Sequence, residues 1–427
     1  MSTKMKRISI LAGFTMLVVL LLVGQGLAQT ALTPEQELGS FLYFDINLSE
    51  PAGQSCASCH DPDFGFVDPD SHLPVSEGVI PGKFGGRNSP ASAYAMYAPI
   101  FDFEEGEGLW IGGQFWDGRA TGDFLGDPLA DQAIGPFENP VEIANTRLGV
   151  LESIKASDYY DTYYEPICGS LDDLSDPEIV DDRYHCVGLS IAAFERSGLF
   201  GQFSSHYDAY LAACLDAGET PNNCAQGIGK VASKVGKKYF SKEEWYGFQL
   251  FMGENNNDGI LDPGEGAMCV ACHVADWTAA ADYALPVVVP PWAPEGMVPP
   301  VFTDFTFDNL GVPKNEEFPL TGASVDLGLG TIVGDAEENG KFKVMTLRNI
   351  GLTAPYAHNG LFKTLKEITH FYNTRDVPGS LRKGMDWDPP EYPDTVNFDE
   401  LGNLGLSDAD EDALVEFMKT LSDGYAP

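Results

Sequence analysis

The sequence predicts a mainly α-helical protein of two domains, with long loops and little β structure. A pentapeptide of the form C-x-x-C-H occurs twice, at residues 56–60 and 269–273. A capped, amphipathic segment precedes each copy. The chain has 427 residues, and single hydrophobic cores stop growing well below that length. We therefore expect one helical domain around each pentapeptide.

The helix expected before the first pentapeptide is marked by its cap. Thr33 and Gln36 fit a capping box, and Pro34 suits the first helical position. Its apolar face is formed by Leu38, Phe41 and Leu42.

The second half repeats this arrangement. Ser241 and Glu244 fit a capping box, and the apolar face that follows is formed by Trp245, Phe248 and Met252. A closing helix is expected from Ser407, with the apolar residues Leu414, Phe417 and Leu421. Helix, pentapeptide and closing helix is the order of elements in a cytochrome c-like domain.

The stretches between these helices are rich in Gly, Pro and Asp. Segment 285–300 contains the run Pro290–Pro294 and the pair Pro299–Pro300, and such segments do not sustain helices. We expect ordered loops there. The domain boundary is expected near Gly229–Lys238, which gives domains at residues 29–235 and 236–427.

The first 28 residues have the layout of a secretory signal peptide. Lys4, Lys6 and Arg7 precede an apolar run at residues 8–23 and a small-residue exit at residues 26–28. A membrane anchor is the alternative if cleavage fails. We expect export to the periplasm and no membrane span in the mature protein, since no second long apolar run follows.

The C-x-x-C-H pentapeptide has the spacing needed for covalent haem attachment. Two thiols can each add to a vinyl group of one haem, and the adjoining histidine then reaches the iron. The alternatives are chance, a zinc site or a thiol redox couple, and two complete copies disfavour all three. We predict two c-type haems, held by Cys56, Cys59, His60, Cys269, Cys272 and His273.

The chain is strongly acidic, with 25 Lys+Arg against 64 Asp+Glu and a formal net charge of −39. Loss of the signal peptide would remove three positive charges and no negative ones. So negative a field disfavours nucleic acid and anionic membranes, and would steer a cationic partner such as a basic cytochrome c or a cupredoxin. Solubility or a salty habitat is the alternative explanation.

Four cysteines lie outside the pentapeptides, at positions 168, 186, 214 and 224. In an exported protein we expect two disulfides, and sequence proximity favours Cys168 with Cys186 and Cys214 with Cys224, one of three pairings. Zinc binding that involves His185 is the alternative.

With both pentapeptides placed, the chain resembles the bacterial diheme cytochrome c peroxidase and MauG family. The resemblance runs from about Leu38 to Leu421 and is carried by residues 38–39, 44–45, 86–90, 115–119, 132–133, 135–136, 139–142, 346–349 and 352–356. It implies that the first haem is the peroxide site and the second an electron-transfer centre. His60 and His273 would then be the proximal ligands.

The resemblance also implies a set of residues around the first haem. Gln132, Pro136 and Glu142 match the family's distal pocket, where Glu142 would move a proton between the oxygens of hydrogen peroxide and so allow formation of a ferryl intermediate. Gln132 would orient the peroxide, and Pro136 would shape the pocket. Trp116 resembles the tryptophan between the haems. The alternatives are a surface or helix-start carboxylate for Glu142 and a core indole for Trp116.

The second axial ligand of the second haem is expected at Tyr372, seventeen residues after Pro355. Peroxidase members of the family have methionine there, and MauG-like members have tyrosine. A phenolate stabilises high-valent iron, whereas a methionine thioether raises the reduction potential. His370 and His358 are the nearest alternative ligands.

The chain departs from the family pattern at two positions. Ile80 occupies the place of the distal histidine of peroxidase members, so the first haem would be five-coordinate unless His72 substitutes from a longer loop. Ala267 occupies the place of the tryptophan that MauG uses to reach its protein substrate.

Calcium is expected at up to two places. Asn88, Thr353 and Pro355 match the family's calcium ligands, and oxygen donors suit this ion. A loop at residues 254–265 resembles an EF-hand, with candidate ligands Glu254, Asn256, Asp258, Asp262 and Glu265.

Taken together, the sequence predicts an exported diheme enzyme that reduces hydrogen peroxide with electrons from a small redox protein. A MauG-like oxidase that modifies a protein or a small molecule is the alternative, and a pure electron carrier is a third hypothesis. The resemblance also makes a homodimer an expectation.

Overall fold

The computed structural model describes residues 31–253, 266–381 and 384–426. The predicted signal peptide and the EF-hand-like loop lie outside the described residues. The helices are α1 (Pro34–Phe44), α2 (Cys56–Cys59), α3 (Pro128–Glu138), α4 (Arg147–Lys155), α5 (Glu165–Cys168), α6 (Pro177–Glu195), α7 (His206–Asp216), α8 (Pro221–Gln226), α9 (Gly229–Tyr239), α10 (Lys242–Met252), α11 (Leu329–Val333), α12 (Leu365–Thr374) and α13 (Asp408–Lys419).

Strands are few and short, and they form three two-stranded antiparallel sheets. These pair β1 (Asp102–Glu104) with β2 (Leu109–Ile111), β3 (Thr278–Ala279) with β4 (Met297–Val298), and β5 (Phe307–Asp308) with β6 (Phe342–Lys343). Segment 285–300 forms a loop apart from β4. The predicted fold class, mainly helical with little strand, is therefore confirmed.

The predicted helix starts are confirmed by their caps. Thr33 caps α1 in a capping box with Gln36, and Ser241 caps α10 in a capping box with Glu244. Ser407 caps α13, where Asp410 returns the second hydrogen bond. These caps satisfy backbone N–H groups that have no partner inside the helix.

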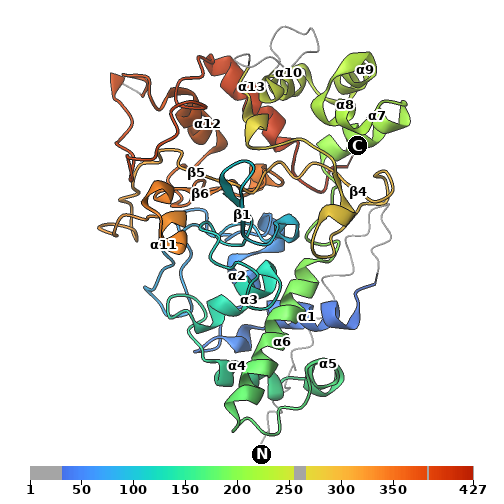
Figure 1. Cartoon of the computed structure of the whole chain (residues 1–427), viewed down its shortest axis with the longest axis vertical. Coiled ribbons are helices and arrows are strands. Elements are labelled where there is room, and N and C mark those ends of the chain that lie inside the picture. The colour runs from blue at the N-terminus through green and yellow to red at the C-terminus, as the bar shows by residue number, and fades with distance from the viewer. Residues whose placement is uncertain (1–30, 254–265, 382–383, 427) are drawn as a thin grey trace, which may run out of the picture. The chain divides into compact units, whose positions relative to one another are not determined.

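Each half of the described chain contains a helix crossing at which the two backbones touch. In the first half α1 crosses α6, and a Cβ on Gly39 would overlap the carbonyl oxygen of Ser190. In the second half α10 crosses α13, and a Cβ on Gly247 would overlap the carbonyl oxygen of Ala413. Figure 1 shows both pairs. The helix α6 is the first-half counterpart of the predicted closing helix, and its start at Asp176 and Pro177 carried an N-cap signal that sequence reasoning missed.

The buried apolar residues form three clusters. The first draws mainly on residues 38–203, the second on residues 207–421, and a small third cluster lies around Phe362 and Phe371. The buried residues of α7, α8 and α9 belong to the second cluster. The predicted domain boundary stays a prediction.

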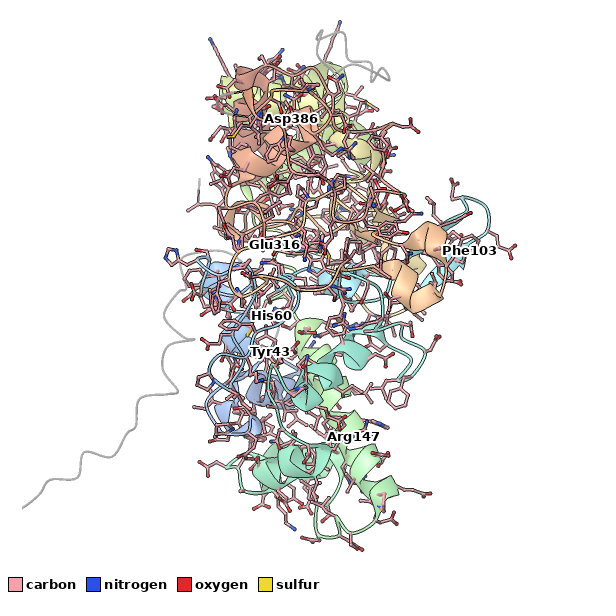
Figure 2. The ribbon with its side chains drawn as sticks, turned by 90° about the vertical axis from the view of Figure 1, so that its left-hand side faces the viewer. Tyr43, His60, Phe103, Arg147, Glu316 and Asp386 are labelled. Carbon is pink, nitrogen blue, oxygen red and sulfur yellow. A yellow bond between two sulfur atoms is a disulfide. The ribbon has the colours of Figure 1, made fainter. Side chains whose placement is uncertain are left out.

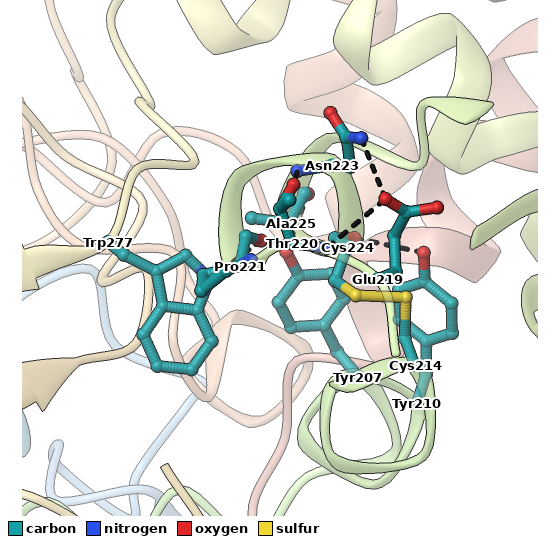
Figure 3. The surroundings of a disulfide bond; sticks show 10 residues. All are labelled: Tyr207, Tyr210, Cys214, Glu219, Thr220, Pro221, Asn223, Cys224, Ala225 and Trp277. Carbon is teal, nitrogen blue, oxygen red and sulfur yellow. Dashed lines mark hydrogen bonds between the residues drawn. A yellow bond between two sulfur atoms is a disulfide. The ribbon is translucent and has the colours of Figure 1, made fainter. Parts of the chain in front are cut away.

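Both predicted disulfides are present, Cys168–Cys186 and Cys214–Cys224. Figure 3 shows the second, where the hydroxyl of Tyr207 donates to Ala225 O at 2.7 Å and that of Tyr210 donates to Cys224 O at 2.9 Å. These bonds fix α8 against α7. The zinc alternative is wrong, because all four of these cysteines are in disulfides.

Within the described ranges, no helix has the length and apolar character needed to cross a bilayer.

Candidate active site

The first pentapeptide forms the short helix α2, capped by Ser55, and His60 follows directly. The thiols of Cys56 and Cys59 are not in a disulfide. Burial raises the pKa of each to about 12, whereas thiols in redox couples and metal sites have lowered pKa values. In the described part of the chain, no group of three His, Cys, Asp or Glu residues is placed to hold a metal ion. The surroundings therefore do not favour a redox couple or a zinc site.

His60 is oriented through one ring nitrogen. Its Nδ1 donates to Phe66 O at 3.2 Å and lies 3.4 Å from Ser89 Oγ, which leaves Nε2 for an iron ion. Burial lowers the pKa of His60, and this favours the neutral imidazole that binds metals. The Tyr43 hydroxyl donates to His60 O at 3.0 Å (Figure 2).

The second pentapeptide repeats this design. Cys269 begins a single 3₁₀ turn (Cys269–Ala271), and the Nδ1 of His273 donates to Phe302 O at 3.0 Å. Burial lowers the pKa of His273 and raises the pKa of the Cys269 and Cys272 thiols to about 12. Both histidines thus hydrogen-bond a backbone carbonyl through Nδ1 and directly follow two thiols that form no disulfide.

A large cavity opens beside the second pentapeptide. Its volume is about 650 Å³, which lies within the usual range for cofactor pockets. Cys269, Cys272 and His273 line it from one element, and Tyr372 of α12 and Phe251 of α10 line it from others. The thiols, the oriented imidazole and this space fit a covalently attached haem.

The three candidate axial ligands, Tyr372, His370 and His358, differ in their access to this cavity. Tyr372 lines it, and the charges of Cys272 and Cys269 affect the pKa of its phenol, which burial raises. His370 bonds Glu411 through Nδ1 at 2.8 Å and Ser380 O through Nε2 at 3.3 Å, so both nitrogens are occupied. His358 lines the cavity, but its ring stacks on Phe342 at 3.6 Å. This arrangement favours Tyr372.

The predicted distal residues lie on α3 and the turn after it. Gln132 and Pro136 are four residues apart on α3 and so share a face. Asn139 follows at the C-cap, and its Nδ2 donates to Glu142 Oε1 at 2.8 Å. The charge of Glu142 raises the pKa of both Cys56 and Cys59, so its carboxylate lies within electrostatic reach of the first pentapeptide.

The groups around Glu142 shift the pKa of its carboxyl in opposite directions, and the net shift is upward. Burial raises the pKa of this carboxyl, and the Arg119 guanidinium and the Asn139 hydrogen bond oppose that rise. Arg119 itself stacks on the Phe115 ring at 3.7 Å and bonds Asp117 at 3.0 Å. Sequence reasoning gave Arg119 no role, although it lies in the quoted 115–119 motif.

Trp116 contacts both halves of the site. Its indole N–H donates to Asn88 O at 2.9 Å, and the neighbouring Ser89 contacts His60. Trp116 also lines the cavity of the second pentapeptide. The structure thus places this indole between the two pentapeptides.

Two buried ionisable residues near the site were also missed. Lys343 lines the cavity and donates through Nζ to Gly113 O at 2.6 Å, and burial lowers its pKa to about 7. Glu195 is 4% exposed, its Oε2 has no hydrogen-bond partner among the described residues, and its charge raises the pKa of Cys56. A sequence pattern gives no signal for either, because their burial comes from tertiary packing.

The predicted calcium ligands Asn88, Thr353 and Pro355 line one small pocket. Its volume is about 10 Å³, on the order of one water molecule. Asp68 and Asp70, which sequence reasoning did not select, line it as well. The residues that line this pocket therefore carry oxygen atoms of the kind that calcium binds.

The structure shows the exposure of the residues at which the chain departs from the family pattern. Ile80 is 38% exposed and the His72 side chain is also exposed. Ala267 is buried and lines the large cavity, so no aromatic ring occupies that position.

Comparison with known proteins gives a consistent set of relatives. A family model described as di-haem cytochrome c peroxidase matches residues 33–214. The chain is 33% identical over 402 residues to the methylamine utilization protein MauG of Paracoccus denitrificans, covering 90% of this chain and 88% of that protein. It is 26% identical over 341 residues to cytochrome c551 peroxidase of Nitrosomonas europaea, covering 79% and 73% respectively.

A solved structure agrees with these sequence matches. The diheme peroxidase BthA from Burkholderia thailandensis superposes with a TM-score of 0.69 at 27% identity, covering 92% of this chain and 87% of that chain.

Proposed function

Because the chain belongs to the di-haem cytochrome c peroxidase and MauG family, we propose that it reduces hydrogen peroxide with electrons from a small redox protein. The observation that carries the proposal is the position of Glu142. This partly buried carboxyl accepts a hydrogen bond from Asn139 and lies within electrostatic reach of the first pentapeptide, where Nδ1 of His60 is bonded to Phe66 O.

Two covalent haems are implied, and the residues to hold them are present. Cys56, Cys59 and His60 would hold the first, and Cys269, Cys272, His273 and Tyr372 the second. The bound iron supplies a binding site for peroxide and the capacity to exchange electrons with it.

The protein's own contribution is proton transfer and orientation. Glu142 takes the proton from one oxygen of hydrogen peroxide and returns it to the other, so that the leaving group departs as water. Burial raises the pKa of this carboxyl above its ordinary value, and a raised pKa suits a group that must both accept and donate a proton. Gln132 lies on the preceding helix, where its amide can hydrogen-bond peroxide.

Electrons reach the first site from the second half of the chain through Trp116. Its ring lines the second cavity while its N–H bonds Asn88, beside the Ser89 that contacts His60. We place the enzyme in the periplasm, since the two disulfides suit an oxidising compartment. Calcium between Asn88, Thr353 and Pro355 would hold the two halves of the site together.

A MauG-like oxidase is the second candidate. Tyr372 lines the second cavity, and Ile80 stands where peroxidase members have a distal histidine. Identity to the Paracoccus MauG protein is 33%. Ala267 argues against the same route to a protein substrate. Addition of one equivalent of peroxide to the fully oxidised protein separates the candidates. A reaction before any reductant is added favours the oxidase, and a reaction that requires prior half-reduction favours the peroxidase.

The role of Glu142 is tested by Glu142→Gln, which preserves shape and removes the ionisable oxygen. We expect the rate of reaction with peroxide, measured by rapid mixing, to fall by about 10²–10⁴-fold. Glu152→Gln, at an exposed position of α4, is the matched control and should react at the rate of the unaltered protein. An unchanged rate in Glu142→Gln would remove the proton-transfer assignment.

A further inference from the structure

A strongly basic segment interrupts this acidic chain. Of its 427 residues 64 are Asp or Glu, yet residues 220–242 contain none. The same segment contains five lysines, Lys230, Lys234, Lys237, Lys238 and Lys242. Four of these lie on α9, and Lys242 begins α10.

These lysines are exposed and have no carboxylate partner among the residues that the structure describes. All five side chains are exposed, and none forms an ion pair with a described residue. The other described Lys and Arg residues are ion-paired, apart from Lys83 and the buried Lys343. The unpaired positive charge of the described chain is thus concentrated on one short segment.

Helix geometry gathers the lysines on one face of α9. Positions 230, 234, 237 and 238 follow the spacing i, i+4, i+7 and i+8, which defines a single stripe. The other side of α9 is used for packing, since Ala232 and Gly236 are buried and Gly236 lies against the Trp245 ring. We refer to Lys230, Lys234, Lys237 and Lys238 as the lysine face.

The helix behind the lysine face leads to the second cavity. Trp245 of α10 contacts α9 at Gly236, and Phe251 of α10 lines the cavity. Aromatic rings connect these ends, with Trp245 at 5.4 Å from Phe248, and both Phe248 and Phe251 against Phe417. Figure 1 shows α9 beside α10. A protein bound to α9 would therefore be connected, through Trp245 and this row of aromatic rings, to the cavity that fits the second haem.

We propose that the lysine face is the docking surface for a redox partner protein whose own docking surface is rich in carboxylates. This inference rests on the proposed electron exchange and names the partner's contact chemistry. It also qualifies the expectation from net charge. The overall charge of −39 acts at long range, but salt screens charges beyond about 8 Å, so the local lysines dominate at contact.

Charge and shape argue against two other occupants. Membrane-surface helices bury an apolar face among lipid headgroups, whereas the apolar side of α9 is packed against the protein. In a symmetric dimer formed through this surface the lysine faces of the two copies would lie against each other, and like charges at contact oppose that pairing.

The test compares the haem-loaded protein with the fourfold variant Lys230→Gln, Lys234→Gln, Lys237→Gln and Lys238→Gln. Lys83→Gln, at an exposed lysine outside this segment that forms no ion pair with a described residue, is the matched control. The probes are short poly-L-glutamate and a small acidic cytochrome c, with binding followed by anisotropy at low and at physiological ionic strength. We expect about a tenfold or greater loss of affinity in the fourfold variant, no loss in the control, and carbodiimide cross-links from α9 to the probe. Unchanged haem absorbance and circular dichroism would show that the variant is folded.

Several outcomes would overturn the docking surface. These are no binding of either probe at low ionic strength, equal affinity in the fourfold variant, tighter binding to phosphatidylglycerol vesicles than to the probes, or a dimer in sedimentation that the variant abolishes. Binding is measured without peroxide, and peroxide consumption is measured separately with a small-molecule donor. A failure of docking is therefore distinguishable from a failure of the proposed function.

Discussion

Glu195 near the end of α6 gives the protein a pH-dependent stability that one substitution should remove. Its side chain is 4% exposed, its Oε2 has no described partner, and burial raises its pKa from 4.5 to about 8. Arg196 opposes this rise but is already engaged by Asp127, at 2.5 and 2.8 Å. The folded protein therefore keeps a proton on Glu195 where the unfolded chain has lost it.

The sign and the size of the effect follow from these values. Between pH 4.5 and about 8 the folded state binds more protons than the unfolded state at this site, so the free energy of unfolding falls as the pH rises. The full interval corresponds to at most roughly 5 kcal/mol. Glu195→Gln cannot ionise, so the variant should lose this dependence and be more stable than the unaltered protein near pH 8.

The assay is the melting temperature of the haem-loaded variant and of the unaltered protein between pH 5 and pH 8.5. For a chain of this length 4–5 kcal/mol amounts to roughly 5 °C. The difference between the two proteins should therefore grow by up to that amount as the pH rises. Glu152→Gln, at an exposed position, should show no such growth. Parallel melting curves for Glu195→Gln and the unaltered protein would refute the reasoning.

Two further predictions concern the helix crossings and the second haem. Gly39→Ala and Gly247→Ala should each lower the free energy of unfolding by about 1–3 kcal/mol, because a methyl group at either crossing overlaps a backbone carbonyl oxygen. Denaturant titration measures this, and Gly198→Ala, which meets no atom within 4 Å, should have little effect. Tyr372→Met should raise the reduction potential of the second haem, since a thioether favours ferrous iron. A redox titration that gave the original potential would show that Tyr372 is not a ligand.

The haem-attachment residues could be predicted because they are a local pattern. Covalent attachment requires two thiols and a histidine within five residues, so the chemistry is readable without a fold. The helix caps at Thr33, Ser241 and Ser407 were predictable for the same reason, since a cap satisfies N–H groups three residues away.

Other features of the site depend on residues far apart in the chain. Tyr372 and His370 lie two residues apart, and only the structure shows that Glu411 and Ser380 occupy both nitrogens of His370. The burial that raises the pKa of Glu195 and lowers that of Lys343 likewise comes from packing. The lysine face was visible in the sequence as a run without acidic residues, but its lack of ion pairs was not.

The sequence by itself determined the two haem-attachment motifs and the helical class, because each depends on short-range spacing or on a pattern repeated along one element. It favoured one of three disulfide pairings, and the structure contains that pairing. Only the tertiary structure decided which side chains meet. It brings Glu142 within reach of the first pentapeptide and places Trp116 between the two halves of the site. It also turns the lysines of α9 away from the core. Desolvation and charge pairing act through space, so their effects on these groups follow from the packing of distant segments and not from their order in the chain.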